Sequence, residues 1–255
     1  MQNISSTKNS KIQYIKSLYT SKGRTEHAAF VVEGEHMVQE ALQYANVQCI
    51  AVDESYVEKY KNLLQGEVLL CTSNVFKSIS DTKTPQGICA VCNMQESPAL
   101  SNKILICNAV QDPGNVGTLI RTADAAGFSV LLDNQCADIY NPKVLRSTMG
   151  SIFHIAVKRS ANIEHNVRTL INDGFAVYAA ILGGEAFYER KKDASKLAIM
   201  IGNEGKGIAP ALQELCTHTF TLPMLGKAES LNAGVAGAIM MYDIIRKDKE
   251  NEQRI

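Results

Sequence analysis

Short apolar segments alternate with amphipathic ones throughout the second half of the sequence. Five apolar runs predict strands: "ILICNAV" (104–110), "SVLLD" (129–133), "IFHIAV" (152–157), "FAVYAAIL" (175–182) and "KLAIMIG" (196–202). Helical periodicity falls at 115–126, 142–150 and 162–173, and in a long terminal segment from about Ser230. This alternation predicts a mostly parallel sheet with helices on both faces and a ligand site at the carboxyl ends of the strands.

The first half of the sequence predicts a second, smaller α/β domain. Residues 9–20 place their apolar side chains on one helical face, and residues 28–45 fit a strand followed by a helix. Further apolar runs at 47–54 and 86–92 predict strands. The stretch "NMQESPALSNK" is polar and rich in turn formers, so we divide the chain into residues 1–98 and 99–255.

Charge is balanced overall but uneven along the chain. The formal net charge is zero, yet the first 25 residues contain no acid and five cations, Lys8, Lys11, Lys16, Lys22 and Arg24. These cations are expected to face solvent or the phosphates of a nucleic acid. The alternative is that these cations only keep a surface helix soluble and bind no ligand.

Seven cysteines form no disulfide framework, and the sequence contains neither a secretory leader nor a long apolar span. These features predict a protein of the reducing cytoplasm without a membrane segment. Cys89 and Cys92, in "CAVC", suggest either half of a metal or redox site or two small core residues. The strand-like alternation around them and the missing second pair of ligands favour core residues.

Three loops rich in glycine and polar residues each follow a predicted strand: "QDPGNVG", "IGNEGKGIAP" and "LPMLGKAESLNAG". None has the GxGxxG spacing of a dinucleotide-binding turn. The second also lacks the first glycine and the Ser or Thr of a phosphate-binding P-loop. A dinucleotide-dependent oxidoreductase and a P-loop enzyme are therefore not supported.

The polar residues of these loops each allow two interpretations. Arg121 either holds a phosphate near a helix start or pairs with Asp124 on the surface, and Asn115 can cap that helix. Glu204 fits either a carboxylate that fixes other loops or a solvated turn residue. Ser230, with Asn232 behind it, fits a simple cap of the terminal helix as well as a site residue.

Together the three loops resemble the signature motifs of the SpoU, or TrmH-type, RNA ribose 2′-O-methyltransferases of the SPOUT superfamily. The matching segments are "QDPGNVGTLIRTADAAGF", "IMIGNEGKGI" and "TLPMLGKAESLNAGVAGAIMMYD", in the family's order and spacing. The segments "FVVEGEHMVQEAL" and "ISDTKTPQGICAV" resemble the family's amino-terminal substrate-binding domain, so the likeness covers nearly the whole chain.

The resemblance implies a carboxy-terminal trefoil-knotted methyltransferase domain. It also implies S-adenosyl-L-methionine bound at the knot and a homodimer whose active sites combine residues of both subunits. We expect this dimer to form through the small-residue face of the terminal helix, Ala233, Ala236 and Gly237. No metal is needed, because the leaving group of methyl transfer departs neutral.

The resemblance also assigns roles to individual residues. Arg121 would contact the substrate phosphate and the ribose hydroxyl and is the family's proposed general base, although a guanidinium is a hydrogen-bond donor that ordinarily stays charged. Asn115, Glu204, Ser230 and Asn232 would organise that arginine and the ribose. The cofactor contacts would be Ala180, Ile181, Gly202, Leu222, Met224 and Leu231.

The expected partner is RNA. A separate amino-terminal domain with a basic leading segment favours 23S ribosomal RNA over tRNA, because family members that act on tRNA often lack this domain. A non-catalytic RNA-binding assembly factor with the same fold remains the alternative from another functional class. An assay of methyl transfer to RNA distinguishes the two, because only an enzyme would transfer the methyl group.

Overall fold

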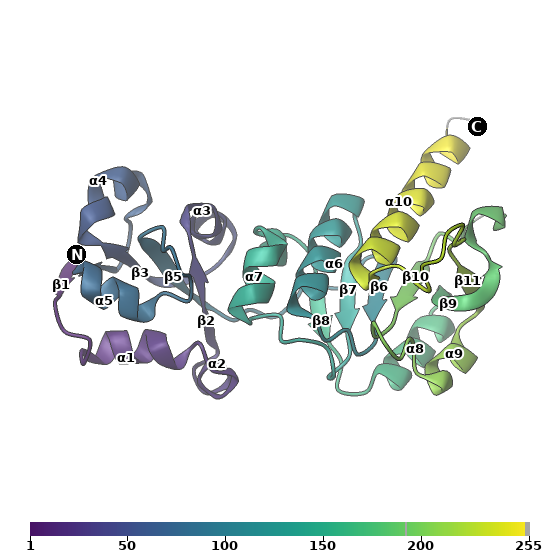
Figure 1. The fold of residues 1–255 in the computed structure, drawn as a ribbon, viewed down its shortest axis with the longest axis horizontal. Helices are drawn as coiled ribbons and strands as arrows, with labels where there is room; N and C mark the ends of the chain where they lie inside the picture. Colours follow the sequence, from purple (N-terminus) through teal and green to yellow (C-terminus); the bar gives the residue numbers. More distant parts are fainter. Residues whose placement is uncertain (192, 253–255) are drawn as a thin grey trace. The chain divides into compact units, whose positions relative to one another are not determined.

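The computed structural model describes residues 1–191 and 193–252 (Figure 1). The chain folds into two compact units. Unit 1 comprises Met1–Glu96 together with Asp138–His154, and unit 2 comprises Ser97–Ala137 and Ile155–Ile255. No helix in the described ranges combines the length and the apolarity that crossing a membrane requires.

Unit 2 is built on a parallel sheet of six strands in the order β11-β9-β10-β6-β7-β8. Its strands are β6 (Lys103–Cys107), β7 (Ser129–Leu132), β8 (Val157–Arg159), β9 (Ala176–Ala186), β10 (Leu197–Ile201) and β11 (His218–Thr221). Its helices are α6 (Pro113–Ala126), α8 (Ile163–Asn172), α9 (Pro210–Leu215) and α10 (Ala233–Glu252).

Both faces of this sheet are covered, as the sequence predicts. Helices α8 and α9 close one face, where Val167 and Leu212 join side chains of β6, β9 and β10 in one buried cluster. Helices α6 and α10 pack against each other on the opposite face, and α10 also contacts β10. Strands buried on both sides account for the continuous apolar runs in the sequence.

The packing of α10 on α6 corrects the expected role of its small residues. Ala233 and Gly237 are buried, and a Cβ on Gly237 would lie 2.4 Å from Cδ2 of Leu119 in α6. Small residues permit close helix approach here within one chain. The predicted dimer face of Ala233, Ala236 and Gly237 is therefore wrong for the two buried residues.

Two other boundaries differ from the sequence prediction. The run "IFHIAV" contains only the start of a strand, because Ser151–Phe153 form a 3-10 turn and β8 begins at Val157. Helix α9 is not predicted, and the strand expected before the third loop, β11, has no predicted bounds. Each has six residues or fewer, too few to show a clear period.

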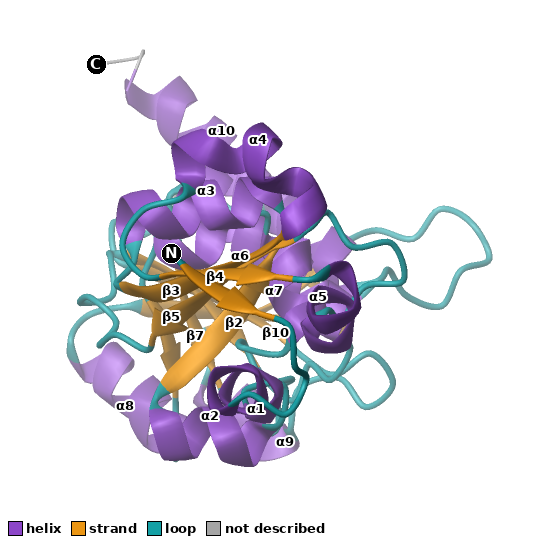
Figure 2. Cartoon of the chain, turned by 90° about the vertical axis from the view of Figure 1, so that its left-hand side faces the viewer, coloured by secondary structure: helices purple, strands orange, loops and turns teal. Residues whose placement is uncertain are grey.

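Unit 1 contains a mixed sheet of five strands in the order β1-β4-β3-β5-β2, in which β5 runs antiparallel to both neighbours (Figure 2). The strands are β1 (Gln2–Ile4), β2 (Ala29–Glu33), β3 (Val47–Asp53), β4 (Val68–Cys71) and β5 (Ile88–Asn93). The helices are α1 (Ser10–Ser17), α2 (Ser21–His27), α3 (Glu35–Tyr44), α4 (Val57–Tyr60), α5 (Ser73–Ile79) and α7 (Pro142–Thr148), with 3-10 turns η1 (Glu54–Tyr56) and η2 (Lys61–Leu63) flanking α4.

The two cysteines of "CAVC" lie in β5 on opposite faces of this sheet. Cys89 joins the buried cluster under α1 and α5, whereas Cys92 joins the cluster under α3 and α4. Burial raises the pKa of the Cys89 thiol well above its usual value and that of Cys92 to about 12. Because their side chains point apart, the two thiols cannot hold one metal ion together.

Arg24 is not the solvent-facing cation that the sequence predicts. Its side chain is buried, donates to the carbonyl of Leu18 and forms an ion pair of 2.5 Å with Asp138. Lys11 is also engaged, through Glu67 and Gln2. Of the basic amino-terminal residues, only Lys8, Lys16 and Lys22 have no such partner among the described residues.

Asp138→Ala is predicted to destabilise unit 1 by about 3–5 kcal/mol, because it leaves the buried Arg24 cation without its counter-charge. Urea unfolding followed by circular dichroism measures the loss. The double variant Arg24→Met with Asp138→Ala should regain part of it, since no buried charge is stranded. A single variant as stable as the wild type would show that the pair does not stabilise the unit.

Candidate functional site

A cavity of about 540 Å³ lies in unit 2 at the carboxyl ends of β9, β10 and β11. This is the edge of the sheet at which ligands are expected in α/β folds. The residues that the resemblance assigns to the cofactor all border it: Ala180, Ile181, Gly202, Leu222, Met224 and Leu231. Glu204 and Ser230 border it as well, whereas Asn115, Arg121 and Asn232 are absent from its lining.

One wall of the cavity is a bulge in β9. The pairing of β9 with β11 shifts between Thr219, opposite Ala179, and Phe220, opposite Glu185, so residues 180–184 bulge out between the two pairs. Gly184 makes this possible, because a Cβ there would lie 2.8 Å from the backbone of Thr219. The bulge brings Ala180 and Ile181 into the cavity lining.

The loop after β10 forms a second wall. Asn203 and Gly207 form a backbone bridge, and a Cβ on Gly202 would lie 2.3 Å from the carbonyl carbon of Gly207. The Asn203 amide oxygen accepts from the backbone N–H groups of Gly205 and Lys206. This close crossing of backbone explains why glycine is required at position 202.

The cap of α6 differs from the prediction. Asp112, not Asn115, caps the helix by accepting from the backbone N–H of Asn115 at 2.9 Å. Similarly, Asn232 rather than Ser230 caps α10, where it accepts from Val235 N–H at 3.2 Å. The side-chain amide of Asn115 is therefore available for other contacts.

Asn115 uses that amide to connect the three loops. Asn232 Nδ2 donates to Asn115 Oδ1 at 2.8 Å, and Asn115 Nδ2 donates to Glu204 Oε1 at 2.7 Å. Asn115 is buried, whereas Glu204 and Asn232 are exposed. Three of the predicted site residues thus form one hydrogen-bonded chain, with the Glu204 carboxylate at its end beside the cavity.

Arg121 lies apart from this chain. It is exposed on α6, and in the part of the chain that the structure describes it makes no ion pair, so the expected alternative of a pair with Asp124 is not found. Asp124 has a different partner. The guanidinium is therefore accessible to an anionic ligand or to a second protein chain.

Sequence reasoning missed the buried side chains that hold the loops together. Asp133, at the end of β7, accepts from Asn108 Nδ2 at 2.5 Å and from Ala109 N–H at 2.9 Å. Asn108 in turn accepts from the backbone of Ala209, and Asn203 Nδ2 donates to the carbonyl of Ala109 at 2.8 Å. The only signal in the sequence is a polar residue directly after an apolar strand.

The two thiols near the site, Cys107 and Cys136, are buried. Burial and nearby carboxylates raise the pKa of Cys107 well above its usual value and that of Cys136 to about 12. Both thiols consequently stay protonated near neutral pH. The polar side chains beside the cavity that remain are the carboxylate of Glu204 and the amides bonded to it.

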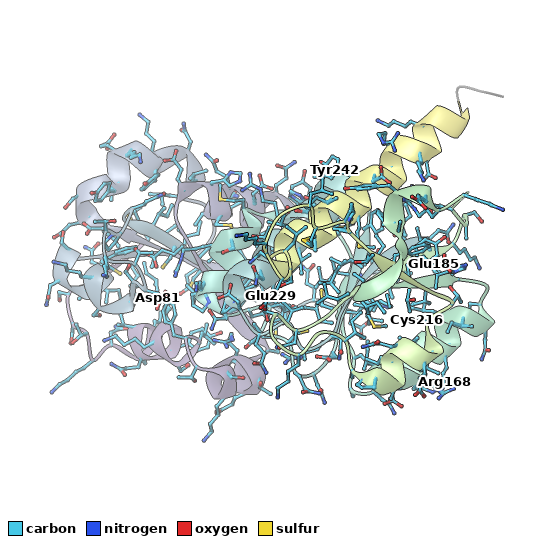
Figure 3. All side chains as sticks on the ribbon, turned by 45° about the vertical axis from the view of Figure 1, so that its right-hand side comes forward. Asp81, Arg168, Glu185, Cys216, Glu229 and Tyr242 are labelled. Atoms are coloured by element: carbon cyan, nitrogen blue, oxygen red, sulfur yellow. The ribbon has the colours of Figure 1, made fainter. Side chains whose placement is uncertain are left out.

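The lining of the cavity fits S-adenosylmethionine. Ile181, Leu222 and Met224 supply apolar surface for an adenine ring, and the backbone of the surrounding loops supplies hydrogen-bonding groups for its edge. The carboxylates of Glu204 and Glu229 complement a positively charged sulfonium, and Glu229 lies on the loop before α10 (Figure 3).

Two protein families match this chain. Residues 102–242 match the SpoU rRNA Methylase family, and residues 9–90 match the MRM3-like substrate binding domain. The chain is 41% identical to the 23S rRNA (guanosine(2553)-2′-O)-methyltransferase RlmP of Bacillus subtilis, over 96% of this chain and 99% of that protein.

Solved structures agree with these matches. The AdoMet-bound rRNA methyltransferase from Sinorhizobium meliloti superimposes with a TM-score of 0.86 at 28% identity, covering 96% of this chain and 98% of that one. A solved structure that concerns the 2-OH methylation of C/U34 on tRNA superimposes with a TM-score of 0.53 at 25% identity. This alignment covers 58% of this chain and 97% of the other chain.

Asn115→Asp is predicted to loosen the loop after β10, because it places a second carboxylate beside Glu204 and removes the amide donor. The expected cost is about 1–3 kcal/mol, or roughly 10- to 100-fold faster amide exchange. Hydrogen exchange at Gly205 and Lys206 measures it. Thr122→Ala is the control, because the Thr122 hydroxyl donates within α6, to the carbonyl of Thr118. Equal exchange in both variants would contradict the coupling.

Proposed function

Because this chain belongs to the SpoU rRNA methylase family, we propose that it methylates a ribose 2′-hydroxyl of 23S ribosomal RNA. The protein is an RNA methyltransferase, and S-adenosyl-L-methionine is its methyl donor. The observation that carries the proposal is the 41% identity with a 23S rRNA 2′-O-methyltransferase over 96% of the chain. The convergence of Asn115, Glu204 and Asn232 supports it.

We assign residues 1–98 to RNA binding and residues 99–255 to catalysis, in a trefoil-knotted domain from which the segment Asp138–His154 packs with unit 1. The family matches at 9–90 and 102–242 support this division. The loops at 202–207 and 222–231 contribute to one cavity, which is where the family resemblance puts the knot. We also propose a cytoplasmic location, which action on ribosomal RNA supports.

The donor supplies an electrophilic methyl group on a sulfonium that departs as a neutral thioether. The protein must place the 2′-oxygen in line with the methyl carbon, so that the O–C bond forms as the C–S bond breaks. It must also let the hydroxyl lose its proton. The loops around the cavity hold the donor, and the Asn232–Asn115–Glu204 chain keeps those loops in register.

Arg121 is the residue that we assign to the acceptor. Its planar guanidinium can donate two parallel hydrogen bonds to a phosphate and can stabilise the developing alkoxide. In this chain Arg121 is exposed and does not border the cavity. The arginine therefore acts together with a donor cavity from a second copy of the chain, as in the composite sites that the family resemblance implies.

The outer face of α10 supports a homodimer. Val235 and Tyr242, seven residues apart and so on one side of the helix, are 47% and 52% exposed, with half-buried Ile239 between them. Tyr242 projects from the outer side of α10 (Figure 3). An exposed apolar stripe of this kind fits a second copy of the helix. It replaces the buried small-residue face as the expected contact.

A ribosomal substrate is favoured over tRNA for a structural reason. The structure associated with C/U34 of tRNA aligns with 58% of this chain although 97% of its own length is covered, so it lacks much of what this chain contains. Mapping of 2′-O-methyl sites in cellular RNA with and without this protein tests the substrate. A site lost only from tRNA would overturn it, and no lost site would indicate a non-catalytic RNA-binding factor.

Arg121→Ala is predicted to abolish methyl transfer while cofactor binding stays nearly intact, because Arg121 is assigned to the phosphate and hydroxyl of the acceptor and not to the methyl donor. Arg121→Lys should also fail, since an ammonium does not reproduce the planar fork. Radiolabelled methyl transfer and calorimetry measure the two properties. Arg168→Ala, at an exposed arginine of α8, is the control. Turnover above roughly a tenth of wild type, a loss of only about 1.4 kcal/mol, would contradict the assignment.

Val235→Asp with Tyr242→Asp is predicted to give a folded monomer that binds the donor more weakly than the dimer and does not turn over. The paired charges cannot be buried at the interface without cost. Analytical ultracentrifugation measures the mass. An unchanged dimer would remove this face from the interface, and an active monomer would show that one chain is sufficient.

A further inference from the structure

The two faces of the unit 1 sheet differ in charge. Helices α1 and α5 pack against each other on one face over a shared apolar cluster, and their charged residues are all lysines: Lys11, Lys16 and Lys77. The other face is covered by α3, η1, α4 and η2, which contain four glutamates. There Lys59 pairs with Glu35 at 3.0 Å, and Lys61 lies 4.0 Å from Glu58.

Four lysines, in α1, in α2, in α5 and in the loop after α5, have no such partner. Across the described residues, no ion pair or hydrogen bond engages the side chains of Lys16, Lys22, Lys77 and Lys83. Lys77 lies in the last turn of α5, and Lys83 lies in the loop that follows it. Unpaired cations grouped on one face repel one another and are complementary to a polyanion.

The loop between α5 and β5, residues 80–86, is held firmly in spite of its position at the surface. The carboxylate of Glu33, at the end of β2, accepts hydrogen bonds from the Ser80 hydroxyl, from Thr82 Oγ1 at 2.7 Å and from Asp81 N–H at 3.0 Å. Three donors on one carboxylate fix the start of the loop.

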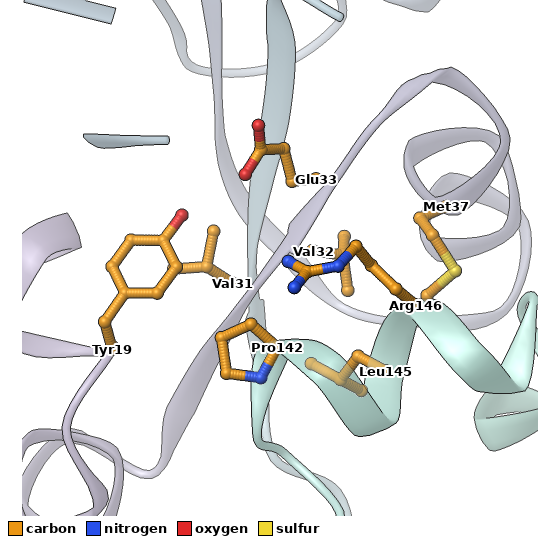
Figure 4. Close-up of a pocket in the computed structure, with 8 residues that line it drawn as sticks. All are labelled: Tyr19, Val31, Val32, Glu33, Met37, Pro142, Leu145 and Arg146. Atoms are coloured by element: carbon orange, nitrogen blue, oxygen red, sulfur yellow. The ribbon is translucent and has the colours of Figure 1, made fainter. Parts of the chain in front are cut away.

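Two further contacts hold the start of this loop. Tyr19 donates its hydroxyl to the carbonyl of Ile79 at 2.6 Å, and Arg146 pairs with Asp81 at 3.0 Å. Tyr19, Glu33 and Arg146 converge at this point (Figure 4).

At the other end of the loop, Tyr60 donates to the Gln86 carbonyl at 2.7 Å. The tip, with Lys83 and Thr84, remains exposed between these two fixed ends. A rigid loop that presents a cation loses little entropy when it binds.

We propose that unit 1 binds the phosphate backbone of its RNA through the α1/α5 surface, defined by Lys16, Lys22, Lys77 and Lys83. Glu33 is a positioning residue that sets the loop carrying Lys83. The inference rests on the proposed function only for the identity of the ligand as ribosomal RNA. The acidic α3/α4 side faces away from the phosphates.

The test compares two charge-matched double variants, K77Q/K83Q on the proposed surface and K59Q/K61Q on the opposite face. Binding of protein-free 23S ribosomal RNA is measured against salt concentration without methyl donor. K77Q/K83Q should lower the slope of log K against log salt by about 2, one for each lost phosphate contact. Its KM for RNA should rise about tenfold or more, with unchanged kcat and donor affinity.

K59Q/K61Q should stay within twofold of the wild type in all of these measurements. Equal losses in both double variants, or an unchanged slope in K77Q/K83Q, would overturn the proposal. Binding through this surface by a protein that transfers no methyl group would refute the proposed function and leave the surface intact. Conversely, turnover by K77Q/K83Q with an unaltered KM for RNA would refute the proposed surface and leave the proposed function intact. If the wild-type protein fails to bind RNA and captures an acidic protein instead, the proposal of an RNA-binding surface is refuted.

Glu33→Gln separates loop positioning from net charge. The substitution removes one negative charge, so electrostatics alone would strengthen RNA binding. It also replaces one carboxylate oxygen with an amide N–H that cannot accept from the loop, so loss of positioning should weaken binding several-fold. Tighter binding by Glu33→Gln would refute the role of Glu33. Thermal unfolding and an unchanged donor affinity establish that the variant is folded.

Discussion

The buried carboxylate of Asp133 and the amides of Asn108 and Asn203 hold the functional end of unit 2 together. Loops that leave a parallel sheet carry backbone groups that neither the sheet nor a helix satisfies. Asp133 accepts from the loop after β6, Asn108 accepts from the loop after β10, and Asn203 connects those two loops at the carbonyl of Ala109. These bonds tie the loops to one another where Asp133 and Asn108 are buried, and so they hold the walls of the cavity in place.

This scaffold separates two tasks within one chain. The cavity residues and the Asn232–Asn115–Glu204 chain lie together on one side, whereas Arg121 lies exposed on α6 and outside the cavity lining. A composite site reconciles the two positions, because a second copy can supply the arginine that a single cavity lacks. In the proposed dimer, the exposed stripe on α10 would bring the arginine of one copy to the cavity of the other.

Unit 1 achieves its asymmetry with few residues. One sheet separates two apolar clusters, and the helices over each cluster differ in charge. The basic amino-terminal segment is only part of the basic face, because Arg24 is buried against Asp138 and Lys11 is paired with Glu67. Lys77 and Lys83, more than fifty residues later, complete the surface.

The sequence by itself determined the α/β class, the parallel sheet and the loops that form the site, because these depend on local periodicity and on motif order. It also determined the family, since three ordered motifs identify it. Only the tertiary structure decided that Asp112 and Asn232 cap the helices and that Gly237 packs against Leu119. It likewise decided that Arg24 is buried and that Arg121 lies outside the cavity. These outcomes depend on which distant residue lies opposite a side chain, and no local pattern in a sequence contains that information.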